Sequence, residues 1–222
     1  MIHAMTQRMA VIDFETTGMS PAYGDRATEV AIVMTEEGQV VDRFQSLMNA
    51  GVPIPPFIES LTGISNAMLA DAPTPAEAMR AAAEFVGDAP MVAHNASFDR
   101  RFWHGELALA GLNATQPFAC TVLLSRRLFP EATSHKLSAL AGWLHIERSG
   151  QAHRALSDAE VTAELLLRLQ SALRERHGIA NPDHDFLMRL QACSKAGLPK
   201  FIARCLASQC AEAKDTTTAT HQ

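Results

Sequence analysis

Two acidic residues, two positions apart, end the first apolar run of the chain. In the stretch VIDFETTG, residues 11–18, Asp13 and Glu15 flank Phe14. Alternate residues of a strand point to one face, so both carboxylates should lie side by side at a strand's C-terminal end, with Phe14 facing the core. Adjacent like charges repel, so the pair makes sense around a hard cation such as Mg²⁺ or Mn²⁺. The alternative is a solvated strand end with two chance acids.

Two further segments place acidic residues where helices should begin. HNASFD, residues 94–99, leads into a helix with Asp99 in its first turn; HRALSDAE, residues 153–160, puts His153 ahead of a long helix that carries Asp158 near its start. Taken singly, each acid also fits a helix N-terminus stabilised by the macrodipole. Taken together, four carboxylates and one histidine match a two-metal phosphodiesterase site, in which the metals lie ~3.5–4 Å apart.

The elements that must position these residues alternate between strands and helices. Five short apolar segments read as strands: residues 9–14, two within 28–49, 89–95 and 116–121. A tight turn at Glu37 and Gly38 separates the second strand from the third. Five amphipathic segments read as helices: residues 74–88, 97–111, 122–129, 136–144 and 154–176. The pattern predicts an α/β fold with a mixed five-stranded sheet flanked by helices. Trp103 and Trp143 fall on apolar helix stripes and are expected in the core.

Composition narrows the class of protein. The chain has 222 residues, 47% of them hydrophobic, and a net charge of −5, so no overall positive field attracts nucleic acid. A local site or a bound metal would have to supply that attraction. Neither a membrane span nor a signal peptide is evident, and we expect a cytoplasmic protein. The cysteines lack zinc-site spacing and are expected to be reduced thiols: Cys120, Cys193, Cys205 and Cys210.

With these motifs, the sequence resembles the DEDDh (DnaQ-like) 3′–5′ exonucleases of the ribonuclease H-like superfamily. That family includes the epsilon proofreading subunit of DNA polymerase III and ribonuclease T. The resemblance runs from about Met9 to Leu169, on the motifs DFETTG (13–18), TGI (62–64), HNASFD and HRALSDA. It implies a ribonuclease H-like fold with an exonuclease domain at residues 8–177. A small C-terminal helical extension is expected at 183–211, after a linker at 178–185, with a disordered tail at 212–222.

The resemblance also implies roles for the five catalytic candidates. Asp13 would bridge two divalent metal ions, Mg²⁺ or Mn²⁺. Glu15 and Asp158 would complete the site of the metal that holds the attacking water, and Asp99 would support the second metal. His153 would be the general base, because an ordinary histidine pKa of ~6.5 suits that task near neutral pH.

Weaker expectations concern the substrate. The residues expected to bind the 3′-terminal nucleotide are Thr16, Thr17, Gly18, Ile64, Asn95 and Phe98. Gly18 could equally end the strand, Phe98 could be a core residue, and Asn95 could cap a helix. His94 is expected to be structural. One or two of five arginines should contact phosphate: Arg100, Arg101, Arg126, Arg127 and Arg154.

The implied function is a metal-dependent 3′–5′ exonuclease that shortens single-stranded nucleic acid, with DNA slightly favoured over RNA, and releases nucleoside 5′-monophosphates. The alternative is a nucleic-acid-binding or polymerase-associated module whose catalysis is incidental or lost. The complete set of five catalytic candidates argues against loss. The acidic charge balance argues against a pure binder. A homodimer and association with a polymerase are both compatible with the sequence.

Overall fold

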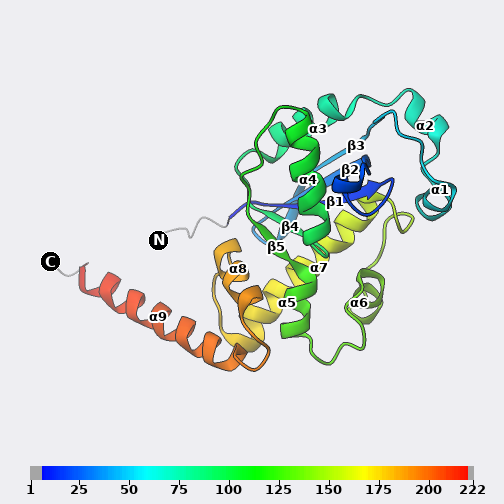
Figure 1. The fold of residues 1–222 in the computed structure, drawn as a ribbon. Coiled ribbons are helices and arrows are strands. Elements are labelled where there is room, and N and C mark those ends of the chain that lie inside the picture. Colours follow the sequence, from blue (N-terminus) through cyan, green and yellow to red (C-terminus); the bar gives the residue numbers. More distant parts are fainter. Residues whose placement is uncertain (1–6, 220–222) are drawn as a thin grey trace.

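The computed structural model describes residues 7–219, and its centre is a five-stranded sheet (Figure 1). The strands are β1 (Met9–Thr16), β2 (Ala27–Glu36), β3 (Gln39–Leu47), β4 (Met91–Ala93) and β5 (Phe118–Cys120). Their order is β3-β2-β1-β4-β5; β1, β2 and β3 form an antiparallel meander, whereas β4 and β5 run parallel to β1. The expected mixed sheet is confirmed, and the C-terminal ends of β1, β4 and β5 share one edge.

The hairpin between β2 and β3 turns where the sequence predicts. Glu37 and Gly38 both have positive φ angles, 51° and 75°. Two consecutive residues of this kind make the two-residue turn whose twist matches that of the flanking strands. The hairpin therefore returns β3 alongside β2 without a longer loop.

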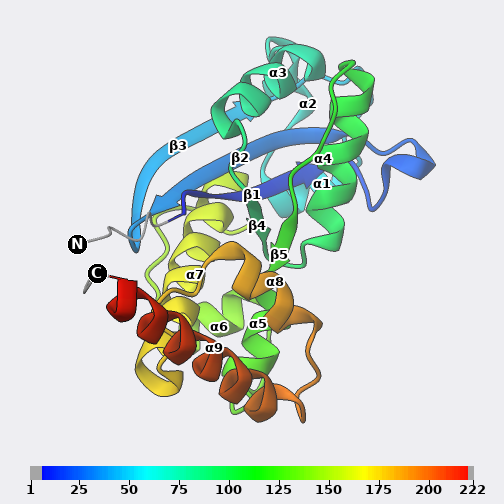
Figure 2. The ribbon, with the colours of Figure 1, turned by 90° about the vertical axis from the view of Figure 1, so that its left-hand side faces the viewer.

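Helices cover both faces of the sheet. In chain order, the helices of the described residues are α1 (Pro56–Thr62), α2 (Asn66–Ala70), α3 (Pro75–Val86), α4 (Ser97–Leu109), α5 (Thr121–Leu128), α6 (Leu137–Trp143), α7 (Ala155–His177), α8 (His184–Ala192) and α9 (Leu198–Ala219). A short 3₁₀ turn, η1 (Pro21–Tyr23), precedes them. Figure 2 shows α3 and α4 on one side of the sheet and α5, α7 and α8 on the other. The predicted start of α3 is confirmed by a reciprocal capping box between Thr74 and Glu77.

Strand β1 divides its side chains between these two layers. Val11 belongs to the core shared with α7, whereas Ile12 and Phe14 belong to the core shared with α3 and α4. By strand alternation, Asp13 and Glu15 face the α7 side. The register of one buried strand thus aims both carboxylates at the N-terminus of α7.

The C-terminal region differs from its sequence-based description. Ile179 and His184, in the expected linker, are fully buried, and His184 Nε2 hydrogen-bonds to the Met91 carbonyl at 2.8 Å. Helix α8 shares the core of α7, and Phe186 of α8 packs on Phe201 of α9 at 5.4 Å between ring centroids. Helix α9 continues to Ala219, so residues 212–219 are helical rather than disordered; residues 220–222 lie outside the described part.

Other expectations can be checked singly. Trp103 is fully buried, as predicted, but Trp143 is 40% exposed, because it lies at the end of α6, where its ring packs edge-on against Phe129. Cys120, Cys193 and Cys205 are free thiols, and the side chain of Cys210 lies outside the described part. Within residues 7–219, no helix has the length and apolar character to cross a membrane.

Candidate active site

A cavity of about 270 Å³ opens where β1 ends beside the N-termini of α4 and α7. All five predicted catalytic residues line it: Asp13, Glu15, Asp99, His153 and Asp158. Two of the carboxylates come from β1, and the others come from the first turns of α4 and α7. Three segments far apart in the sequence therefore bring their acids to one place.

Burial makes Asp13, Glu15 and Asp99 hard to ionise in the absence of a cation. Burial raises the pKa of Asp13 well above its ordinary value, and the neighbouring charges of Asp99, Glu15 and Asp158 raise it further. The pKa of Glu15 is raised to about 8, mainly by burial and then by the neighbouring charges of Asp158 and Glu29. Burial also raises the pKa of Asp99 to about 7, although two backbone N–H donors, one of them from Phe14, oppose the change. The cluster holds more negative charge than its surroundings compensate.

Three of the five residues offer ligand atoms within 4.8 Å of one another, namely Glu15, His153 and Asp158. Asp13 and Asp99 lie outside that close group but line the same cavity. Oxygen-rich donors with uncompensated negative charge suit Mg²⁺ or Mn²⁺, and one imidazole does not change that preference. The residues present therefore fit divalent cations.

His153 sits on a strained and accessible turn. Its side chain is exposed, its φ angle is +60°, and its backbone N–H donates to Asp158 Oδ2 at 3.1 Å. A non-glycine residue with positive φ costs of order 1 kcal/mol and persists where neighbouring contacts enforce it. Here the contact with Asp158 ties the histidine backbone to a predicted metal ligand.

Sequence reasoning missed Glu29, which supports this turn. Glu29 lies directly opposite Glu15 in the β1–β2 ladder and is fully buried. It accepts two hydrogen bonds from Arg154, at 2.8 and 3.2 Å, one from the Ala155 N–H and one from Gln45. Burial would raise the pKa of Glu29, but these hydrogen bonds outweigh it and hold the pKa below its ordinary value. A lone Glu within the apolar strand ATEVAIVM is the signal that could have found it.

Arg148 is the second residue that was missed. Its guanidinium forms an ion pair with Asp158 Oδ1 and donates to Ser157 Oγ at 3.2 Å. Both oxygens of Asp158 are therefore engaged by the loop that precedes α7. The positive charge of Arg148 therefore competes with a divalent cation for Asp158.

The Thr-Thr-Gly turn has mixed roles. Thr16 and Gly18 line the cavity, and their contact with substrate stays a prediction. Thr17 is buried and does not line it; its hydroxyl instead accepts the Arg26 N–H at 3.0 Å and closes the loop that follows β1. Gly18 also leaves room for Asp25, because a Cβ there would lie 2.4 Å from the Asp25 carboxylate.

The apolar wall of the cavity differs from the prediction. Phe98 lines it as expected, but Ile64 is fully buried and packs with Ile54 and Leu69 behind the wall. The exposed apolar side chains of this wall belong to Phe57 and Leu61 of α1, together with Met19.

Asn95 and His94 follow β4. Asn95 is exposed, has a φ angle of +68° and lines a neighbouring cavity instead. Its side chain does not cap α4 either. His94 hydrogen-bonds to Thr121 at 2.8 Å and to the His135 carbonyl at 3.1 Å, and burial lowers its pKa to about 4. These contacts agree with the structural role expected for His94.

Comparison with known proteins places this arrangement in a family. The sequence model of the exonuclease family (RNase T type) matches residues 10–166, which include all five catalytic candidates. The chain belongs to the exonuclease family. The expectation of a DnaQ-like exonuclease domain is confirmed, and the match ends before α8.

Relatives share this exonuclease domain within much longer proteins. The PolC-type DNA polymerase III of Bacillus cereus is 41% identical over 167 residues, which cover 75% of this chain and 12% of that protein. The 3′–5′ exonuclease DinG of Bacillus subtilis is 43% identical over 171 residues, covering 76% and 18%. The chain thus spans less than a fifth of either relative.

Solved structures confirm the ribonuclease H-like fold. Exonuclease X, in complex with 5′ overhanging duplex DNA, has a TM-score of 0.62 and 27% identity, covering 81% of this chain and 98% of that one. E. coli Exonuclease I, in complex with a dT13 oligonucleotide, has a TM-score of 0.66 over 78% of this chain and 43% of its own. At 18% identity, the latter supports the fold alone.

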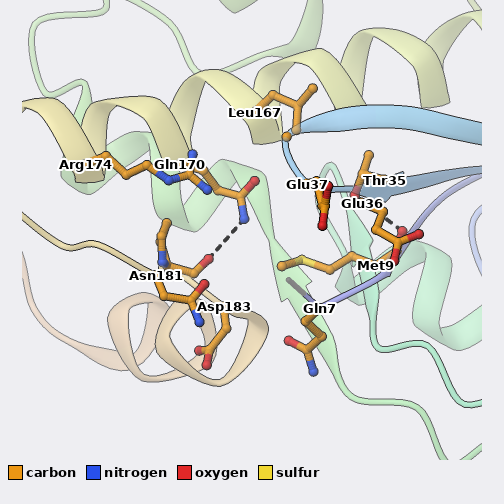
Figure 3. A pocket seen from close by; sticks show the side chains of 12 residues that line it. Gln7, Met9, Thr35, Glu36, Glu37, Leu167, Gln170, Arg174, Asn181 and Asp183 are labelled. Carbon is orange, nitrogen blue, oxygen red and sulfur yellow. Dashed lines mark hydrogen bonds between the residues drawn. The ribbon is translucent and has the colours of Figure 1, made fainter. Parts of the chain in front are cut away.

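A second hollow of the exonuclease domain lies at the opposite edge of the sheet, where β1 begins (Figure 3). It measures about 10 Å³ and is lined by Gln7, Met9, Glu36, Gln170 and Arg174, among others. Such a volume holds about one water molecule. It is too small for a nucleotide, and none of the five catalytic candidates lines it.

Proposed function

We propose that the chain is a two-metal-ion 3′–5′ exonuclease that removes nucleoside 5′-monophosphates from single-stranded 3′ ends. The observation that carries the proposal is the convergence of four carboxylates and His153 on one cavity with an apolar wall. The relative DinG of Bacillus subtilis is a 3′–5′ exonuclease, which supports the same reaction. The Exonuclease X complex with DNA and the polymerase relatives support DNA as the substrate.

The residues divide the work by chemistry. Asp13, Glu15 and Asp158 would hold one divalent cation, and Asp13 and Asp99 would hold the second. Bound there, the cations would lower the pKa of the attacking water and offset charge on the phosphate. Phe57 and Leu61 of α1 present exposed apolar surface on which the terminal base can stack.

His153 acts as the general base of the proposed reaction. One of its ring nitrogens accepts a proton from water as the water oxygen attacks phosphorus. The bond from phosphorus to the 3′ oxygen of the preceding nucleotide breaks, and that oxygen takes up a proton from solvent. The released nucleotide keeps its phosphate on the 5′ carbon. Glu29 and Arg154 position this histidine through the backbone at the start of α7.

The decisive experiment follows 5′-labelled single-stranded DNA and RNA of one sequence, incubated with the full chain and Mn²⁺ or Mg²⁺. A ladder that shortens from the 3′ end supports the exonuclease, and its relative speed on DNA and RNA gives the sugar preference. Chelation should abolish the ladder. No shortening of either strand by folded, metal-bound protein would overturn the proposal.

Two variants sharpen this experiment. Asp158→Asn should abolish hydrolysis, whereas Glu164→Asn, a carboxylate removal further along α7 and outside the cavity, should not. His153→Gln should lower kcat by about 10²–10⁴-fold, the usual contribution of a general base. His153→Gln should still bind Mn²⁺, as measured by the increase in melting temperature that the metal causes. An unchanged kcat in this variant would exclude His153 as the base.

A further inference from the structure

Another cavity, distinct from the small hollow of Figure 3, lies on the same edge of the sheet as the candidate active site. It measures about 290 Å³ and opens at the C-terminal ends of β4 and β5, beside the first turns of α4 and α5. Its lining residues are Asn95, Ala96, Ser97, Arg100, Phe118, Cys120, Val122, Leu123, Arg126 and Gln191. We refer to it as the Arg100–Arg126 cavity.

The charge of this cavity is positive in a chain that is negative overall. Neither Arg100 nor Arg126 forms an ion pair among the described residues, and no described Asp or Glu lines the cavity. A histidine lies close to Arg126. Burial lowers the pKa of His135, and the charges of Arg126 and Lys195 lower it further, so each of these two cations lies near His135. The cavity therefore offers unneutralised guanidinium groups to an anion.

The other arginine candidates have structural partners or lie outside this cavity. Arg127 donates to the carbonyls of Cys193 and Leu123, and Arg154 is held by Glu29. Arg101 is exposed and does not line the cavity. Of the five arginines that the sequence offered as phosphate contacts, only Arg100 and Arg126 line this cavity.

The order of the strands gives this cavity a place relative to the reaction. Leu47, Glu29 and Glu15 are in register across β3, β2 and β1, and β4 and β5 follow on the same edge. The apolar wall for the terminal base belongs to α1, whose Ile58 packs in the same small cluster as Leu47. Along the edge, the carboxylates therefore lie between the apolar wall and the Arg100–Arg126 cavity.

We propose that the Arg100–Arg126 cavity binds phosphate groups of the substrate strand on the 5′ side of the hydrolysed bond. The inference rests on the proposed function, since it takes the terminal nucleotide to occupy the wall formed by α1. The strand then runs from that wall, past the carboxylates, to the ends of β4 and β5. Guanidinium groups suit this task, because they bind phosphate oxygens through paired N–H donors.

The test measures binding separately from hydrolysis. In a full-length Asp13→Asn background, fluorescence anisotropy follows single-stranded oligonucleotides of increasing length, from a dinucleotide upward. Without the arginine substitutions, affinity should rise in a step once the strand reaches the cavity. Arg100→Ala/Arg126→Ala should remove this step and leave dinucleotide affinity unchanged. The slope of log affinity against log salt should fall by about 0.7 for each phosphate that an arginine no longer binds, or about 1.4 for two.

Controls keep the result specific. Arg174→Ala removes one positive charge from an exposed position at the opposite edge of the sheet and should change neither the step nor the slope, whereas each single variant, Arg100→Ala or Arg126→Ala, should lower the slope by about 0.7. Arg100→Lys/Arg126→Lys, which keeps both charges, should restore most of the affinity for long strands. An equal fall in affinity in Arg174→Ala, or an unchanged length step in the double alanine variant, would overturn the proposal. So would a background protein that binds no strand of any length. Failure of the proposed function is seen separately, as the absence of a ladder with the unsubstituted chain and metal.

Discussion

Without divalent cations, the protein should lose stability as the pH rises from 7 to 8.5. The folded state keeps a proton on Glu15, whose pKa is raised to about 8, whereas unfolded glutamate has a pKa of ~4.3 and is ionised throughout this range. The raised folded pKa contributes stability that is complete below the unfolded value and is lost as the pH passes the folded value. A full proton of difference changes the free energy of unfolding by ~1.4 kcal/mol per pH unit. Because Glu15 is half ionised near pH 8, the loss across this range is about 1 kcal/mol.

Urea unfolding in the presence of a chelator measures this loss. Several buried histidines have lowered pKa values, His94 and His184 among them, and they oppose the trend weakly because their unfolded forms lose protons near pH 6.5. Glu15→Gln carries the same histidines, so the difference in slope between the two proteins reports Glu15 together with its effect on the pKa of Asp13. The wild-type protein should lose about 1 kcal/mol more than Glu15→Gln between pH 7 and 8.5. Equal slopes would show that Glu15 is already ionised in the metal-free fold, and the argument from burial would be wrong.

Three further substitutions test the supporting contacts. Arg148→Ala should tighten Mn²⁺ binding, measured by calorimetry, because it frees an oxygen of Asp158; weaker binding would show that the ion pair preorganises the ligand instead. Glu29→Gln should cost about 2–4 kcal/mol in urea unfolding, because it leaves a partly buried arginine without its partner, and it should lower kcat by displacing His153; unchanged stability would contradict this role. Gly18→Ala should cost about 1–3 kcal/mol by overpacking against Asp25, and a neutral result would mean that the loop relaxes freely.

The sequence was enough to predict where the five catalytic candidates meet. Asp13 and Glu15 are related by strand alternation, and Asp99 and Asp158 stand in the first turns of helices. Both are local relations that can be counted along the chain. Parallel strands then bring such ends to one edge, which makes the meeting place a consequence of the fold class.

The supporting residues could not be predicted in the same way. Glu29 reaches Arg154 across 125 positions of sequence, and its contact depends on the register of β2 against β1. Ile64 was misplaced for a similar reason, because its burial depends on packing against Ile54 and Leu69, which its own motif does not reveal. The linker expected at residues 178–185 contains polar and turn-forming residues, yet Ile179 fills the core beside α7.

Charge connects these observations into one account of how an acidic chain could hold a polyanion. The net charge of −5 offers no general attraction, and the buried carboxylates would repel phosphate if they were ionised without cations. Divalent cations at Glu15 and Asp158 would reverse the local sign where the bond is cut. The two arginines of the Arg100–Arg126 cavity would hold the phosphates that follow. Because neither feature depends on the total charge of the protein, the affinity for strands should respond to substitutions at these two places and not to charge elsewhere on the surface.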